Sequence, residues 1–155
     1  MKYFEVSIHQ RRLDNLFEQI DKIPQDPELL SHWARYLCVL SSGFLEIAVR
    51  IIYGRYASAK SEPRVAKFVD RQLKLHFQNL DMERLVQLAN SFSPDWAAEL
   101  EKKCAGELEA SVNSIISNRN RIAHGEDVPG LTYGRIRDYY SNLTKVIQLL
   151  ENQCQ

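Results

Sequence analysis

The stretch that decides the fold is Glu28–Tyr56, ELLSHWARYLCVLSSGFLEIAVRIIYGRY. Its large apolar side chains recur at steps of four, three, four, three and four residues. They are Trp33, Leu37, Leu40, Phe44, Ile47 and Ile51. This spacing places them on one face of a helix and is typical of the seam of a helical bundle. The stretch therefore predicts one long central helix with this face buried.

Helical periodicity continues on both sides of this stretch. The predicted flanking helices cover residues 4–20, 61–77, 81–90, 95–103, 107–123 and 132–151. The breaks DKIPQDP at 21–27 and GEDVPG at 125–130 separate helices, and no alternating β pattern appears. The sequence thus predicts an all-α bundle whose centre is formed by three long helices, 28–56, 107–124 and 132–151, with shorter helices flanking them.

Two of these helices carry specific core predictions. The last helix has a seam with steps of four, three, four and three residues, at Ile136, Tyr140, Leu143, Ile147 and Leu150. In the helix over 61–77, the residues expected to face inward are Val65, Phe68, Val69 and Gln72. Both sets follow from the spacing of apolar residues on a helix.

Length and composition indicate one soluble domain spanning residues 1–155. Its core is expected at 28–151, preceded by an N-terminal helix and connector over 1–27. The apolar fraction of 45% and the charged fraction of 26% are those of an ordinary globular protein. Three scattered cysteines, a charged N-terminus and the lack of a long apolar run favour a reduced, cytoplasmic protein with no membrane partner.

The formal net charge is zero, so the chain as a whole is not attracted to nucleic acid. Charge is nevertheless uneven along the sequence. Residues 50–74 hold seven Lys or Arg against two carboxylates, and residues 81–110 hold seven carboxylates against three cations. The basic segment fits either an RNA-binding face or ordinary solvated helix surface.

Sequence motifs for nucleotide binding, metalloproteases and serine hydrolases are absent. None of the four histidines has a second His or a Cys at a helical spacing of three or four residues, so no metal and no cofactor are expected. Cys38 has no neighbouring base and is expected to be a small core residue.

One segment departs from the apolar pattern, Ser117-Asn118-Arg119-Asn120-Arg121-Ile122-Ala123-His124-Gly125. The apolar residues Leu108, Val112 and Ile115 form the seam of this helix. Extending the seam by the same steps places Arg119 where an apolar residue is expected. A guanidinium is costly to bury without a partner, so Arg119 must meet a carboxylate, a cleft or another subunit. His124 follows at the predicted helix end, and Asn120, four residues earlier, shares its face.

These residue types suit phosphodiester cleavage. A cationic donor stabilises charge that builds on phosphate, and a histidine moves protons near neutral pH. Arg119 and His124 are about 140° apart on an ideal helix, so they converge only if the last turn loosens or if two copies meet. The alternative is structural: His124 as a helix-ending cap and Arg119 in an internal ion pair.

The string Arg119-Asn120-Arg121-Ile122-Ala123-His124-Gly125, placed on the penultimate long helix, resembles the RxxxxH signature of the HEPN superfamily. The upstream helix containing Ser42-Gly43-Phe44-Leu45-Glu46 is most similar to the RiboL-PSP type of HEPN domain. The resemblance implies a helical bundle that dimerises so that two signatures share one cleft. It also implies metal-independent RNA cleavage that leaves 2′,3′-cyclic phosphate and 5′-hydroxyl ends.

The resemblance further implies site residues. Arg119 and His124 match the signature pair, Asn120 matches the polar residue after the Arg, and Glu46 matches, more loosely, an acidic residue on the long helix. We expect Glu46 either to pair with Arg119 and orient it or to pair with Arg50 at i+4. The remaining RNA-binding candidates lie outside the signature: they are Arg121, expected to contact phosphate, and Arg50 and Tyr53, expected to line the same groove as Arg119 and Glu46.

The resulting hypothesis is a dimeric endoribonuclease acting on RNA, in a toxin, antiphage or RNA-processing context, with an antitoxin or another partner protein as a further possibility. The alternative is a non-catalytic helical module that dimerises or binds RNA or protein.

Overall fold

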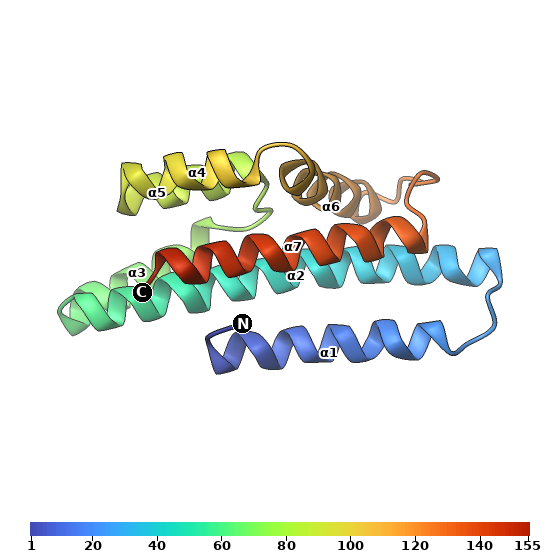
Figure 1. Cartoon of the computed structure of the whole chain (residues 1–155), viewed down its shortest axis with the longest axis horizontal. Coiled ribbons are helices and arrows are strands. Elements are labelled where there is room, and N and C mark those ends of the chain that lie inside the picture. The colour runs from blue at the N-terminus through green and yellow to red at the C-terminus, as the bar shows by residue number, and fades with distance from the viewer.

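Seven α-helices and no strand make up the computed structural model, which describes all 155 residues (Figure 1). The helices are α1 (Phe4–Asp21), α2 (Pro27–Lys60), α3 (Pro63–His76), α4 (Met82–Phe92), α5 (Pro94–Cys104), α6 (Glu107–Ala123) and α7 (Tyr133–Gln153). The predicted all-α bundle with three long central helices is confirmed.

Four of the seven helices, α2, α3, α4 and α7, begin at a side chain that accepts a hydrogen bond from one of their first backbone N–H groups. Asp26 accepts a hydrogen bond from Leu29 N at 2.9 Å at the start of α2, and Asp81 and Thr132 do the same for α4 and α7. Proline occupies the first turn of α2, α3 and α5, where its missing N–H has no intrahelical partner to lose. Local signals therefore explain why the predicted boundaries lie within a few residues of the observed ones.

The bundle has three layers in the view of Figure 1. α2 and α7 lie side by side in the middle layer, with α1 along one side of α2. On the other side lie α6 and the α4–α5 hairpin, and α3 folds back along the C-terminal half of α2. α2 is thus in contact with α1, α3, α6 and α7.

Because several helices surround α2, its buried face is broader than the predicted seam. Leu37 and Phe44 are buried, whereas Ile47 is 39% exposed, so the prediction of a fully buried seam is wrong at that position. Small side chains fill much of the remaining buried face: Ala34, Cys38, Ser41, Ser42 and Ala48. Small residues let neighbouring helices approach α2 closely.

The other two core predictions have opposite outcomes. All five predicted seam residues of α7 are buried, which confirms that seam. In α3 the residues facing α2 are Ala66 and Leu73, whereas Val65 and Phe68 are exposed, so the inward assignment of these two is wrong. Along its length α3 packs against α2. The two buried positions Ala66 and Leu73 are enough to fill that contact.

α2 is long and apolar enough, with a mean hydropathy of 1.6 over its best 18 residues, to pass a simple test for a membrane-spanning helix. Of that window, 56% is buried inside the bundle. The apolar residues of α2 are therefore largely accounted for by the protein core.

α1 is held at its start by a side chain from α7. Tyr3 offers no side-chain cap of its own, and the Glu151 carboxylate accepts hydrogen bonds from Lys2 N at 2.8 Å and Tyr3 N at 3.2 Å. Glu151 is the one charged residue that is buried in this chain. The N-terminal helix is thus capped by a residue about 150 positions further along the chain.

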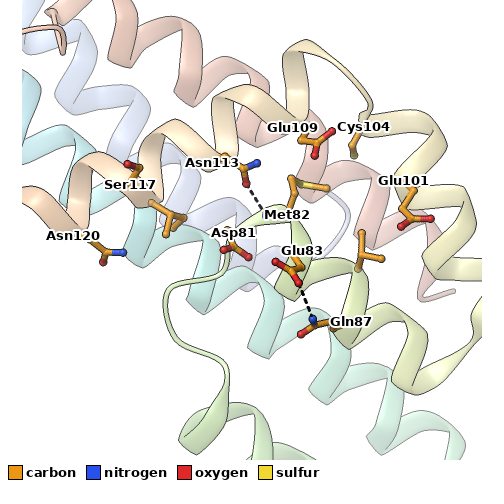
Figure 2. A pocket seen from close by; sticks show the side chains of 12 residues that line it. Asp81, Met82, Glu83, Gln87, Glu101, Cys104, Glu109, Asn113, Ser117 and Asn120 are labelled. Atoms are coloured by element: carbon orange, nitrogen blue, oxygen red, sulfur yellow. Dashed lines mark hydrogen bonds between the residues drawn. The ribbon is translucent and has the colours of Figure 1, made fainter.

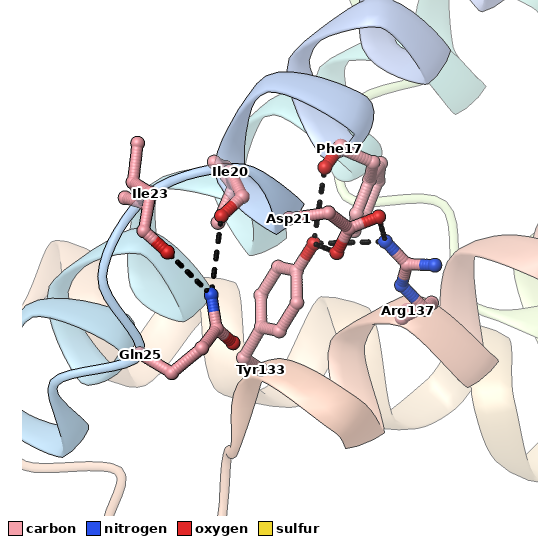
Figure 3. Close-up of polar contacts among 7 residues, drawn as sticks. All are labelled: Phe17, Ile20, Asp21, Ile23, Gln25, Tyr133 and Arg137. Carbon is pink, nitrogen blue, oxygen red and sulfur yellow. Dashed lines mark hydrogen bonds and ion pairs between the residues drawn. The ribbon is translucent and has the colours of Figure 1, made fainter.

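The other end of α1 is tied to the start of α7 (Figure 3). The Tyr133 hydroxyl donates to Asp21 Oδ1 at 2.7 Å, and Arg137 forms an ion pair with the same carboxylate. The Arg137 guanidinium also lies over the Phe17 ring, 5.7 Å from its centroid. These contacts complete the attachment of α1 to the bundle.

This cluster predicts a pH-dependent contribution to stability. The Tyr133 hydroxyl and then Arg137 lower the pKa of Asp21 below 3.8, its ordinary value. A carboxyl whose pKa is lowered by folding stabilises the protein above its unfolded-state pKa, and this contribution is lost as the pH falls through the folded-state pKa. We expect Asp21→Asn to lower the free energy of unfolding at pH about 7 and to have a smaller effect at pH about 3.

Urea unfolding at both pH values measures this difference. Asp138→Asn is the control, because Asp138 is exposed and forms no ion pair. A loss of stability in Asp21→Asn that is equal at the two pH values would contradict the assigned role of the ionised carboxyl.

Candidate functional site

The signature segment forms the C-terminal half of α6 and ends in a tight helix stop. Gly125 has a φ of 71°, a left-handed conformation that glycine adopts without steric cost. Its N–H donates to Ile122 O at 3.0 Å, and Glu126 N donates to Arg121 O at 2.9 Å. This pair of bonds is a Schellman motif, and it places His124 as the last residue before the chain turns away.

Arg119 lies where α6 contacts α2. The Cys38 thiol of α2 donates to Ile115 O at 3.3 Å. Burial raises the pKa of the Cys38 thiol to about 12, while the backbone N–H and the positive charge of Arg119 act in the opposite direction. Cys38 is therefore a buried, unreactive thiol beside Arg119, in line with the expected core role.

The Arg119 guanidinium is half-buried and has no carboxylate partner. Its Nη1 donates to Asn120 Oδ1 at 3.3 Å, and Arg119 takes part in none of the five ion pairs of the chain. Partly desolvated cations normally have a carboxylate nearby, because burial penalises the charge. The positive charge of Arg119 is therefore available to an anion that approaches this end of α6.

His124 is exposed at the end of α6, and its imidazole forms no hydrogen bond within the chain. Its backbone N–H donates to Asn120 O and Arg121 O, at 3.1 and 3.2 Å. The helix stop therefore depends on the backbone of His124 and not on its ring. The exposed imidazole is therefore not held by any other group of the chain.

A cleft of about 880 Å³ begins beside Asn120 and runs between α6, α4 and α5 (Figure 2). Four carboxylates line it, from Asp81, Glu83, Glu101 and Glu109, and no Lys or Arg does. Figure 2 shows Asn113, Ser117 and Asn120 along its α6 wall. The negative lining disfavours a phosphodiester backbone inside this cleft, so an anion would reach Arg119 from outside it.

The structure does not bring Glu46 to Arg119. Glu46 lies eight residues beyond Cys38 on α2, about 12 Å along the helix axis. Its Oε1 accepts a hydrogen bond from Asn79 N at 2.8 Å in the α3–α4 connection. Both predicted ion pairs of Glu46, with Arg119 and with Arg50, are therefore wrong, and its observed role is to hold Asn79 at a φ of 52°.

Arg50 and Tyr53 are also remote from the signature. Arg50 forms two hydrogen bonds of 3.1 Å to the Asp70 carboxylate of α3. Tyr53 is fully buried, with its ring 4.9 Å from that of Phe92. Tyr53 cannot contact RNA from this position, and the prediction that these two residues line the Arg119 groove is wrong.

Arg121 has partners within the chain. Its Nε lies 3.2 Å from Glu126 Oε2, and its Nη2 donates to Asp127 O at 2.7 Å. These contacts brace the loop that follows His124, a role that the sequence pattern did not predict. The guanidinium stays about half exposed and can still meet a phosphate from the solvent side.

A family model for RiboL-PSP-HEPN domains matches residues 7–155. The chain belongs to the RiboL-PSP-HEPN family. This confirms the resemblance drawn from the signature and the long upstream helix. No curated protein and no solved structure matches the chain.

The RiboL-PSP-HEPN domain holds a further cation that the pattern did not single out. Arg35 precedes Cys38 by three residues and so lies on the same side of α2. Its Nη2 is 3.0 Å from His32 Nδ1, and it has no carboxylate partner. The i, i+3 spacing of His32 and Arg35 is visible in the sequence. That Arg35 lies on the same side of α2 as the contact with the Arg119 segment follows only from the contact of Cys38 with α6.

Proposed function

We propose that this RiboL-PSP-HEPN domain is a metal-independent endoribonuclease of HEPN type. In the proposed reaction, the 2′-oxygen of a ribose attacks the adjacent phosphorus and loses its proton to a base. The bond from phosphorus to the 5′-oxygen breaks, and that oxygen gains a proton. The products are a 2′,3′-cyclic phosphate and a 5′-hydroxyl end.

The observation that carries the proposal is the half-buried Arg119 guanidinium without a carboxylate, five residues before an accessible His124. Arg119 would stabilise the negative charge that builds on the phosphate oxygens in the transition state. His124 would act as general base or general acid. Asn120, which accepts from Arg119, would orient the guanidinium.

A second copy is expected on the exposed face of α2. Three large apolar side chains on this face are solvent-exposed: Tyr36, Val39 and Ile47. Val39 lies about 100° around α2 from Cys38, which contacts α6 beside Arg119, so the signature segment lies to one side of this face. A two-fold contact that includes this face and the adjoining end of α6 would bring two signature segments near each other and supply both catalytic groups to one groove.

This arrangement predicts that charge on the α2 face disrupts the dimer and lowers the activity. We expect Val39→Asp combined with Ile47→Asp to convert a dimer to a monomer and to lower RNA cleavage at least about tenfold, since Arg119 and His124 would lose their counterparts. Sedimentation velocity and a cleavage assay measure the two effects. Phe68→Asp, an exposed apolar position on α3, is the matched control. A monomeric but fully active double variant would contradict the composite groove.

The proposal is tested by incubating the purified protein with a mixed-sequence RNA in the presence of EDTA. We expect cleavage that EDTA does not inhibit. Cleavage that requires added Mg²⁺ would overturn the metal-independent reaction, and RNA left intact at every protein concentration would overturn the nuclease.

The second candidate is a binding module without catalysis. It is favoured by the acidic cleft beside Asn120, which suits a basic partner segment better than RNA. The same incubation distinguishes the two, because a binding module leaves RNA uncut. A toxin context would show as a growth defect on expression that His124→Ala relieves.

A further inference from the structure

α3 presents an apolar ridge to solvent. Its members are exposed by 50% at Val65, 62% at Phe68 and 53% at Leu75, with Gln72 between the last two. The steps from Val65 to Phe68, Gln72 and Leu75 are three, four and three residues. This is the spacing of a seam against which a second helix packs, yet no element of the chain covers it.

One side of this ridge is strongly basic. Four exposed cations lie within an arc of about 80° of the helix surface next to the ridge, as the residue spacing requires. They are Arg64, Lys67, Arg71 and Lys74. The one carboxylate within this stretch, Asp70, is already paired with Arg50 of α2 at 3.1 Å. The α3 surface thus combines an apolar seam with an uncompensated positive edge.

The chemistry of this surface selects its occupant. A second copy of α3 would bring two positive edges together and is disfavoured by repulsion. RNA would neutralise the cations but leave the three apolar side chains of the ridge against a charged backbone. A helix with an apolar seam and an acidic edge satisfies both features at once.

We propose that the exposed face of α3 is the docking site for an acidic amphipathic helix of a partner protein. The site is separate from the proposed nuclease groove. α3 is anchored at Arg50, twelve residues beyond Cys38 on α2, which is about 18 Å along the helix axis. Substitutions that abolish partner binding are therefore expected to leave RNA cleavage unchanged, and substitutions that abolish cleavage are expected to leave partner binding unchanged.

The test uses two synthetic helical peptides of 28 residues, about four heptads, with Leu at every a and d position. One carries Glu at every e and g position and the other carries Lys. Fluorescence anisotropy with the full-length protein is expected to show binding of the Glu peptide and none of the Lys peptide. Phe68→Ser combined with Leu75→Ser, and separately Lys67→Glu combined with Arg71→Glu, are each expected to weaken binding at least tenfold, about 1.4 kcal/mol.

Val39→Ser combined with Ile47→Ser is the matched control, since it removes two exposed apolar side chains from α2. It is expected to leave peptide binding unchanged, and the α3 variants are expected to keep wild-type RNA cleavage. Three results would each overturn the proposal: no binding of the Glu peptide, equal binding by the α3 variants, or a homodimer that the Phe68 and Leu75 changes dissolve. Tighter binding of a labelled single-stranded RNA than of the Glu peptide at α3 would assign the surface to RNA instead.

Discussion

Replacing His124 by alanine is expected to lower the rate of RNA cleavage by about 10²–10⁴-fold, the usual contribution of a general acid or base. The imidazole is exposed and makes no intrachain hydrogen bond, and the helix stop uses the His124 backbone. The fold should therefore be unchanged in circular dichroism and thermal unfolding. The cleavage rate at saturating RNA isolates the chemical contribution of the ring.

Arg119→Ala is expected to lower the same rate by about 10²–10³-fold, as for the loss of a donor to developing negative charge. Arg119→Lys should recover only part of this rate, since an ammonium lacks the planar pair of donors of a guanidinium.

His76→Ala is the matched control for His124→Ala, because His76 is an exposed histidine at the end of α3. If His124→Ala cut RNA as fast as the wild type, its assignment as the proton-transfer group would be wrong.

Glu151→Ala is expected to lower the free energy of unfolding by about 2–3 kcal/mol, the cost of leaving partly buried donors unpaired. The carboxylate caps α1 through Lys2 N and Tyr3 N, and the start of α1 has no side-chain cap to replace it. Urea unfolding followed by circular dichroism measures the loss. Hydrogen exchange should show that the first turn of α1 opens most easily in this variant.

Glu151→Gln separates capping from packing. The amide keeps the size of the side chain but retains one acceptor oxygen, so about half of the loss is expected. A Glu151→Ala protein as stable as the wild type would contradict the capping role. A Glu151→Gln protein as unstable as Glu151→Ala would show that the charge, and not the hydrogen bonds, is what matters.

The helices and most of their boundaries could be predicted because each rests on local signals. N-cap residues, first-turn prolines and the 3–4 spacing of α7 act within a few residues of one another. Ile47 and Phe68 could not be assigned correctly in this way. Their exposure depends on how many helices surround α2 and α3, which a one-dimensional spacing does not contain.

In the candidate site, too, the features that belong to one helix could be predicted, and the contacts between helices could not. The charge of Arg119 within an apolar seam and the position of His124 before Gly125 are properties of one helix, and the structure places both at the end of α6. The link from Glu46 to Arg119 required knowing where α6 crosses α2. The crossing lies at Cys38, two helical turns away, so Glu46 meets Asn79 instead. Contacts between helices distant in sequence carry no local signal.

The most direct measurement compares an RNA oligonucleotide with the same sequence carrying 2′-O-methyl groups, both incubated with the wild-type protein in EDTA and resolved by mass spectrometry. If Arg119 and His124 promote attack by the 2′-hydroxyl, the RNA is cut to fragments ending in 2′,3′-cyclic phosphate and the methylated strand stays whole. Cleavage of the methylated strand, or fragments carrying 5′-phosphate ends, would contradict that chemistry.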